Sequence, residues 1–181
     1  MKIIIVGAGI GGLATYLSLK KHLPTSTVTV YESHGSPSST NSNVGGGLGL
    51  APNGQRAIAA ISNNAVSYIR QRGFPAPAFT MRNSAGQWLG NYPAGRAERY
   101  GGFEQVLLRR AVVHNALLEE IPEDAVVWGK KVKSVTETEA GATVEFVDGL
   151  VETADLVIGA DGVRSVVREC MFDNQYPATY E

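Results

Sequence analysis

The sequence has only one cysteine, Cys170, among its 181 residues, which excludes an internal disulfide framework. It also lacks an excess of charge, because 16 basic residues against 17 acidic ones leave a formal charge of −1. This balance argues against a nucleic-acid partner. No apolar run is long enough to span a membrane, and the first apolar segment starts one residue after Met1, leaving no room for a signal peptide. We therefore expect a soluble cytoplasmic protein.

Reactive side chains are scarce as well. Cys170 lies in an apolar helical pattern, so we interpret it as a half-buried small residue and not as a nucleophile. The three histidines are interpreted as a helix-end residue (His22), a loop residue (His34) and a helix-surface residue (His114). The sequence predicts no metal site and no side-chain acid or base.

Glycine, in contrast, is abundant, and it is concentrated in loops. The most informative stretch is residues 1–32. Lys2–Val6 is a short β-branched run typical of a strand buried on both faces, and an apolar helical pattern over Leu13–His22 follows. Between them, Gly7, Gly9 and Gly12 form a G-x-G-x-x-G turn, which can bring backbone N–H groups close to a pyrophosphate.

A second strand, Thr27–Tyr31, ends in Glu32, twenty residues after Gly12. A carboxylate at this position is expected to bind the ribose of an adenine dinucleotide. It favours a free ribose diol, as in FAD or NAD, over the 2′-phosphate of NADP. The alternative is that Glu32 is simply a solvent-exposed strand end.

The middle of the chain has fewer motifs. The segment from Gly45 to Leu50 (GGGLGL) is either a second loop close to a ligand or a flexible turn. Helices are expected over 52–61, 65–72 and, as the longest, 103–120. Arg109 and Arg110 fall in the last helix, where a solvated helix face is the alternative to a ligand contact. Strands 78–83 and 87–92 predict a hairpin in a separate sheet.

Towards the end of the sequence, strands over 125–128, 132–138, 142–147 and 150–153 predict an antiparallel meander. A buried strand over 155–160 then leads into Asp161-Gly162 and a short helix over 163–170. An acidic residue and a glycine at the carboxyl end of a parallel strand lie at the edge where such sheets bind ligands.

The segments GAGIGGLATYLSLKK with Glu32, GGGLGLAPN, LLRRAVVHNALLEE and ADLVIGADGVRSVVRE resemble, in order and spacing, the FAD-dependent monooxygenases related to para-hydroxybenzoate and salicylate hydroxylases. The resemblance covers nearly the whole chain and implies an α/β, Rossmann-like FAD-binding fold. That fold has a parallel sheet, an antiparallel β-meander and a partial second, substrate-side sheet over 76–95. It also implies FAD as cofactor, NAD(P)H as reductant and an aromatic or similar small-molecule substrate.

Carried over by position, the resemblance assigns roles to individual residues. Gly7, Gly9 and Gly12, with Ile10 and Gly11 between them, would cradle the FAD pyrophosphate. Glu32 would hold the adenosine ribose. The remaining cofactor-binding positions are assigned to the flavin side (Gly45, Gly47), to the phosphate and ribityl region (Arg110) and to both FAD and NAD(P)H (Asp161, Gly162).

The sequence departs from this family in three ways. No arginine or lysine lies between Glu32 and Gly45, and Tyr16 replaces a small residue on the first helix. The family's Gly-Asp-Ala flavin motif is also missing, so we interpret residues 1–181 as a truncated FAD-binding domain. The alternatives are a catalytically silent dinucleotide-binding module and an NAD-dependent oxidoreductase.

Overall fold

The computed structural model describes residues 1–37, 39, 46–94, 97–173 and 175. They fall into two compact units, residues 1–44 with 117–181 and residues 45–116. Each unit has its own sheets, and the two are described separately below. No helix in the described ranges is long and apolar enough to cross a lipid bilayer.

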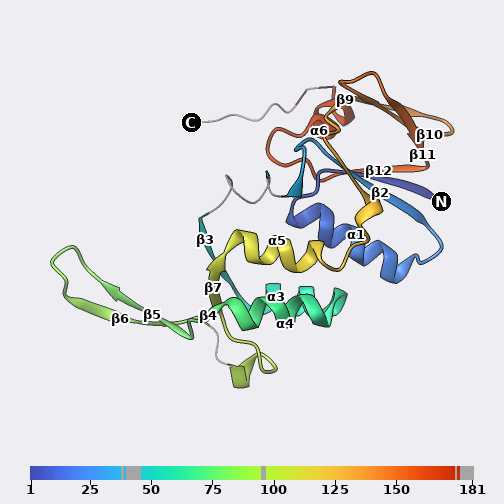
Figure 1. Cartoon of the computed structure of the whole chain (residues 1–181). Coiled ribbons are helices and arrows are strands. Elements are labelled where there is room, and N and C mark those ends of the chain that lie inside the picture. Colours follow the sequence, from blue (N-terminus) through green and yellow to red (C-terminus); the bar gives the residue numbers. More distant parts are fainter. Residues whose placement is uncertain (38, 40–45, 95–96, 174, 176–181) are drawn as a thin grey trace. The chain divides into compact units, whose positions relative to one another are not determined.

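The first unit is built on a parallel sheet, as the fold prediction requires (Figure 1). Its strand order is β12, β1, β2, β8, with bounds Leu156–Gly159, Lys2–Val6, Thr27–Glu32 and Val126–Trp128. One prediction was wrong here, because the segment over 125–128 was placed in the meander. Instead β8 pairs in parallel with β2, with Val30 opposite Val126.

Strand β1 is buried on both faces, as its apolar run predicts, and Ile3, Ile4 and Ile5 are completely inaccessible. Helix α1 (Ile10–His22) packs on β1 and β2 through its buried residues Leu13 and Tyr16. It begins at Ile10, three residues earlier than predicted, so Gly11 and Gly12 lie in its first turn.

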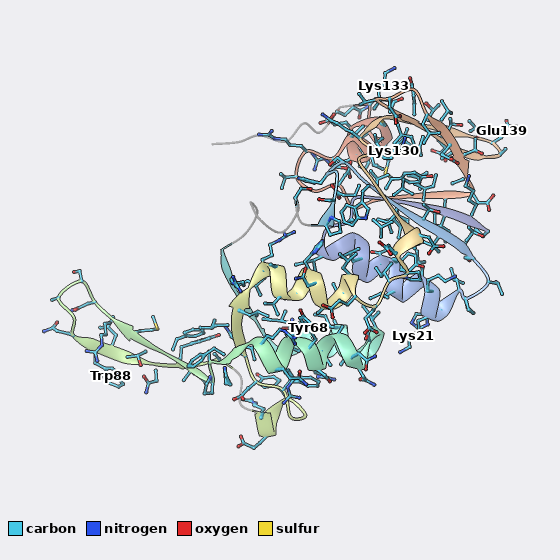
Figure 2. The ribbon with its side chains drawn as sticks, in the orientation of Figure 1. Lys21, Tyr68, Trp88, Lys130, Lys133 and Glu139 are labelled. Atoms are coloured by element: carbon cyan, nitrogen blue, oxygen red, sulfur yellow. The ribbon has the colours of Figure 1, made fainter. Side chains whose placement is uncertain are left out.

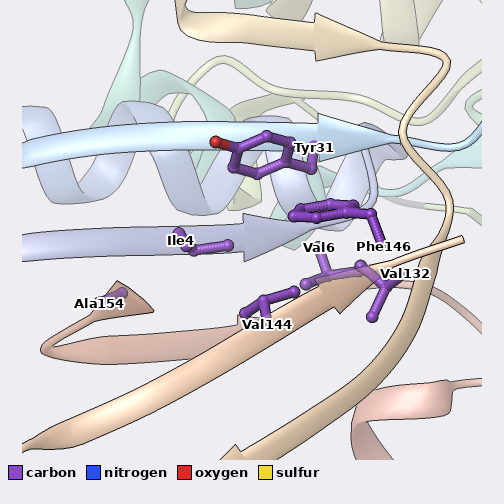
Figure 3. Packing of buried hydrophobic residues seen from close by; sticks show 7 residues of the cluster. All are labelled: Ile4, Val6, Tyr31, Val132, Val144, Phe146 and Ala154. Atoms are coloured by element: carbon purple, nitrogen blue, oxygen red, sulfur yellow. The ribbon is translucent and has the colours of Figure 1, made fainter. Parts of the chain in front are cut away.

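The other face of the parallel sheet packs on an antiparallel meander of β9 (Val132–Thr138), β10 (Gly141–Phe146) and β11 (Val151–Ala154). Phe146 is at the centre of this interface, and its ring centroid lies 4.7 Å from that of Tyr31 (Figure 3). Apolar residues of the two sheets complete the cluster: Ile4, Val6, Val132, Val144 and Ala154. Helix α6 (Val166–Met171) adds Val166 and Val167, which are partly buried against it.

The described part of the second unit contains helices α3 and α4, the first turns of a further helix, and two small antiparallel sheets. Helix α3 (Pro52–Ile61) starts with proline, and α4 (Asn63–Arg72) is capped by Ser62, whose hydroxyl accepts a hydrogen bond from the Ala65 N–H at 3.1 Å. The sheet order is β3, β7, β4, with bounds Gly47–Leu50, Val106–Arg109 and Phe74–Pro75. Two sequence interpretations change, because Gly47–Leu50 is a strand and not a loop, and residues 106–109 are not helical.

The predicted helix over 103–120 is therefore shorter, since α5 spans only Arg110–Leu118. Val106 and Leu108 are buried while Leu107 and Arg109 are exposed, which is the alternation of a strand. A short apolar run fits both the repeat of a helix and the alternation of a strand. Here the backbone pairing of these residues with both β3 and β4 makes them a strand. His114 also differs from expectation, because it is fully buried and not on the helix surface.

The predicted hairpin is confirmed as β5 (Ala78–Arg82) paired with β6 (Trp88–Pro93), a separate two-stranded sheet. Its large side chains are exposed, and Trp88 and Tyr92 are each 62% accessible to solvent. Figure 2 shows Trp88 on this hairpin. Two-stranded hairpins are marginally stable alone in water, and these exposed side chains add little packing to stabilise this one.

Candidate functional site

The candidate site of the first unit lies at the carboxyl edge of its parallel sheet. Strand β1 ends there in the glycine turn, β2 ends in Glu32, and β12 leads into Asp161-Gly162. Two backbone bonds align these ends: the Gly7 N–H donates to the Tyr31 carbonyl, and the Ala160 N–H donates to the Val6 carbonyl, each at 2.8 Å. These two bonds thus bring three segments that are distant in the sequence together at one edge of the sheet.

The glycines of the turn differ in how strictly the surrounding structure requires glycine. Gly7 has φ +103°, and a Cβ there would lie 2.5 Å from the Ala160 carbonyl oxygen. A Cβ on Gly12 would lie 1.9 Å from the Gly7 carbonyl oxygen, so Gly12 allows α1 to start against the turn. A Cβ on Gly11, in contrast, would meet nothing within 4 Å. Space therefore remains open beside the first turn of α1.

The amino end of α1 has the properties of an anion site. Gly9 is the N-cap residue, it offers no side chain to the first N–H groups, and Ile10 is the first helical residue. No acidic residue lies in the first turn, whereas the last turn carries Lys20, Lys21 and His22. Free N–H groups and the helix dipole favour a phosphate at such an end.

Glu32 is buried, with its side chain 8% exposed, so the interpretation as a solvent-exposed strand end was wrong. Its Oε2 accepts a hydrogen bond from the Ala8 N–H at 2.7 Å, which ties the end of β2 to the glycine turn. Its Oε1 accepts bonds from the Ser33 hydroxyl, the His34 N–H and the His34 ring. Burial by itself raises the pKa of the Glu32 carboxyl, but hydrogen bonds from His34, Ala8 and Ser33 outweigh it and lower the pKa below its ordinary value.

The Asp161 carboxylate is hydrogen-bonded to other residues of this chain. Its carboxylate accepts a hydrogen bond from the Ser165 hydroxyl at 2.5 Å and another from the Val167 N–H at 3.2 Å, so it holds the start of α6. Gly162 follows with φ +80°, a conformation that favours glycine. Asp161-Gly162 thus shapes the loop beside Gly7, and its predicted contacts with FAD and NAD(P)H stay a prediction.

The second unit holds the remaining residues that were predicted to bind the cofactor, Gly45, Gly47 and Arg110. Gly47 begins β3 opposite Arg109, and the Arg110 N–H donates to the Gly46 carbonyl at 3.2 Å. Arg110 is half-buried at the start of α5, whereas Arg109 is exposed. Gly45 lies outside the described residues.

Sequence reasoning missed the part played by His34, which was interpreted as a loop residue. Its ring Nδ1 lies 2.6 Å from Glu32 Oε1, and its side chain is 46% exposed. The available signal was its position two residues after the acidic strand end. No group of three or more His, Cys, Asp or Glu side chains within the described part of the chain is placed to hold a metal ion.

Comparison with known proteins supports the family resemblance and the fold. A family model described as an NAD(P)-binding Rossmann-like domain matches residues 5–71. The chain is 34% identical over 170 residues to 3-amino-4-hydroxybenzoate 2-monooxygenase of Streptomyces cremeus, which covers 93% of this chain and 41% of the relative. It is 30% identical over 178 residues to 6-hydroxynicotinate 3-monooxygenase of Pseudomonas fluorescens, covering 97% and 44%.

Among solved structures, HpxO of Klebsiella pneumoniae, complexed with FAD and uric acid, superposes with a TM-score of 0.76 at 30% identity. That match covers 93% of this chain and 41% of HpxO. The chain thus spans about two fifths of the length of the relatives it matches. Over nearly all of its residues, this chain is similar in sequence and fold to the FAD-dependent aromatic monooxygenases that its motifs predict.

Proposed function

We propose that this chain is the FAD-binding portion of an NAD(P)H-dependent flavoprotein monooxygenase acting on an aromatic or similar small organic substrate, in the cytoplasm. One observation carries the proposal: Glu32 Oε2 accepts a hydrogen bond from the Ala8 N–H at 2.7 Å, inside the glycine turn. A ribose acceptor and a pyrophosphate cradle therefore lie side by side, as an adenine dinucleotide requires.

The residues of the first unit fit the ADP part of FAD. The uncapped N–H groups at the start of α1 would bind the pyrophosphate, and open space beside Gly11 would admit it. Glu32 Oε2 has one described donor, Ala8, so it can accept a ribose hydroxyl as well. Bound FAD would supply the redox chemistry with NAD(P)H and O₂, while the chain binds and orients it.

The residues of the second unit would serve the flavin side. Gly47 leaves the exposed face of β3 without a side chain, and Arg110 offers a cation at the start of α5. We propose that Gly45 and Gly47 line the flavin and that Arg110 binds its phosphate or ribityl region. The hairpin of β5 and β6 would belong to the substrate-side sheet that we propose for residues 76–95, and residues 1–181 would form a single FAD-binding domain.

A second candidate is a dinucleotide-binding module without catalysis, because the contacts described at the glycine turn and Glu32 concern binding of the ADP part and not the reacting atoms. Oxygen consumption by the FAD-loaded chain with NADH or NADPH separates the two. Consumption above that of free FAD supports the enzyme, whereas bound FAD without consumption supports the silent module.

The family model's description leaves an NAD-dependent oxidoreductase as an alternative for the same fold. Two measurements distinguish this alternative from our proposal. The first is the visible absorption of the protein after gel filtration with FAD, and the second is a titration with NAD⁺. Our proposal predicts a retained yellow chromophore and weak NAD⁺ binding. A colourless protein that binds NAD⁺ would overturn it.

A further inference from the structure

The sheet of β3, β7 and β4 in the second unit has one face that is open to solvent. Side chains alternate along β7, so Leu107 and Arg109 both lie on this exposed face. Their partners in the register of β3 are Gly49 and Gly47, which are exposed as well. Strand β3 therefore adds no side chain here, and its backbone forms a shelf beside the two side chains of β7.

A groove of about 820 Å³ is lined by this face, which is a volume in the range of small-molecule sites. Apart from the glycines of β3, its lining includes Phe74, Leu107 and Val112. Phe74 is 71% exposed and Leu107 is 38% exposed, so the groove presents apolar surface to solvent. A shelf without side chains beside apolar groups suits a flat aromatic ring, because glycine allows a ligand to approach the backbone closely.

The groove also carries positive charge, since Arg72 and Arg109 line it and no acidic residue does. Arg72 ends α4, and its guanidinium carbon lies 3.6 Å from the centroid of the Tyr68 ring. Such stacking uses the face of the guanidinium and leaves the N–H donors at its edge available. Within the described ranges, no Asp or Glu side chain forms an ion pair with either guanidinium.

The two properties together define the chemistry of a ligand. A guanidinium is a planar fork of N–H donors that matches the two oxygens of a carboxylate. The apolar lining and the glycine shelf match a ring that carries this carboxylate. An inorganic phosphate would use the charge alone and would leave the apolar surface uncovered.

We propose that this groove binds an aromatic carboxylate and that Arg109 and Arg72 recognise its anionic group. The inference rests on the proposed function, because it takes the bound carboxylate to be the substrate. It goes further in naming the substrate class and two specificity-determining residues. Gly47, which we propose lines the flavin, borders the same groove, so a ligand held there would lie next to the cofactor.

The test is calorimetric titration of the 181-residue chain with benzoate and with benzamide, which replaces the carboxylate by a neutral group of the same shape. The wild type should bind benzoate about tenfold or more tightly than benzamide. Arg109→Gln and Arg72→Gln should each weaken benzoate binding about fivefold to tenfold, because a charge-assisted donor is lost. Binding of benzamide should stay within about twofold of the wild type.

Two further variants control this experiment. Arg82→Gln removes an arginine from the hairpin, where it donates to the Gly86 carbonyl outside the groove, and should leave benzoate binding unchanged. Arg109→Lys keeps the charge without the planar fork, so its affinity for benzoate should lie between those of the wild type and Arg109→Gln. Circular dichroism melting establishes that each variant is folded before titration.

Titration with 2′,5′-ADP tests a different source of the anion, the phosphate of a nucleotide. Its affinity should change by less than about twofold in Arg109→Gln and Arg72→Gln. A loss of 2′,5′-ADP binding in these variants without a loss of benzoate binding would overturn the inference.

Three other results would also overturn it: no binding of benzoate to the folded chain, equal binding of benzoate and benzamide, or a benzoate affinity that survives in both glutamine variants. Failure of the proposed function would look different. It would appear as a folded chain that binds benzoate through the two arginines but binds neither FAD nor ADP.

Discussion

The Glu32 carboxylate and the Ala8 N–H are 2.7 Å apart, although the residues are 24 positions apart in the sequence. This bond joins the end of β2 to the glycine turn after β1. It makes Glu32 part of the fold as well as of the proposed ligand site, so substitutions there should affect stability and, on that proposal, binding.

We expect Glu32→Gln to destabilise the chain by about 1–3 kcal/mol at pH 7 and to weaken ADP binding about tenfold. The amide can accept hydrogen bonds on only one oxygen, so its NH₂ group must face either Ala8 or the donors of Ser33 and His34. Chemical denaturation and calorimetry measure the two effects. Unchanged stability and affinity would show that the carboxylate is not needed.

The pH dependence of the same variant follows from the lowered pKa of Glu32. A carboxyl whose folded-state pKa is depressed stabilises the fold above its unfolded pKa, and this contribution is lost as pH falls through the folded pKa. The stability difference between wild type and Glu32→Gln should therefore be full at neutral pH and shrink below the ordinary pKa of 4.5. A difference that is constant from pH 7 to pH 3 would contradict this.

The glycine turn offers a matched pair of substitutions. Gly12→Ala should lower the melting temperature strongly or prevent folding, because its Cβ would lie 1.9 Å from the Gly7 carbonyl oxygen. Gly11→Ala meets nothing within 4 Å and should leave the stability unchanged or raise it by up to about 1 kcal/mol. Thermal melts of both variants test the packing, and equal effects would refute it.

Much of the first unit could be predicted from the sequence, because its signals are local. The β-branched run of β1 and the glycine motif that follows it can be recognised from neighbouring residues alone. The strand at Val106–Arg109 was missed because pairing with β3 and β4 outweighs an ambiguous apolar pattern. The His34 bond to Glu32 was missed because no sequence period encodes the direction of a loop side chain.

The interface between the parallel sheet and the meander should depend on Phe146, which is 1% exposed. Phe146→Ala should cost about 3–5 kcal/mol, measured by denaturant unfolding, because it leaves a cavity against Tyr31. Phe74→Ala is the control, since Phe74 is 71% exposed and its loss should cost far less. Similar costs for both would contradict the core as described.

The exposed hairpin should make the isolated chain associate. Trp88, Leu89 and Tyr92 are each more than 60% exposed on β6, and apolar patches of this kind promote contact between molecules. Replacing Trp88 and Leu89 together by lysine should shift the chain towards monomer in sedimentation velocity experiments at high concentration. A wild-type chain that is monomeric throughout would show that the hairpin needs no cover.

The central claim is that the carboxyl edge of the parallel sheet binds the ADP part of FAD. Its most direct measurement is calorimetric titration of the folded 181-residue chain with FAD, ADP and riboflavin, using Gly9→Val as the variant that should fill the space of the pyrophosphate. The account predicts that FAD binds, that ADP competes at comparable concentration, that riboflavin does not, and that Gly9→Val abolishes binding while folding is retained. Binding of riboflavin without ADP, or full affinity in a folded Gly9→Val variant, would contradict it.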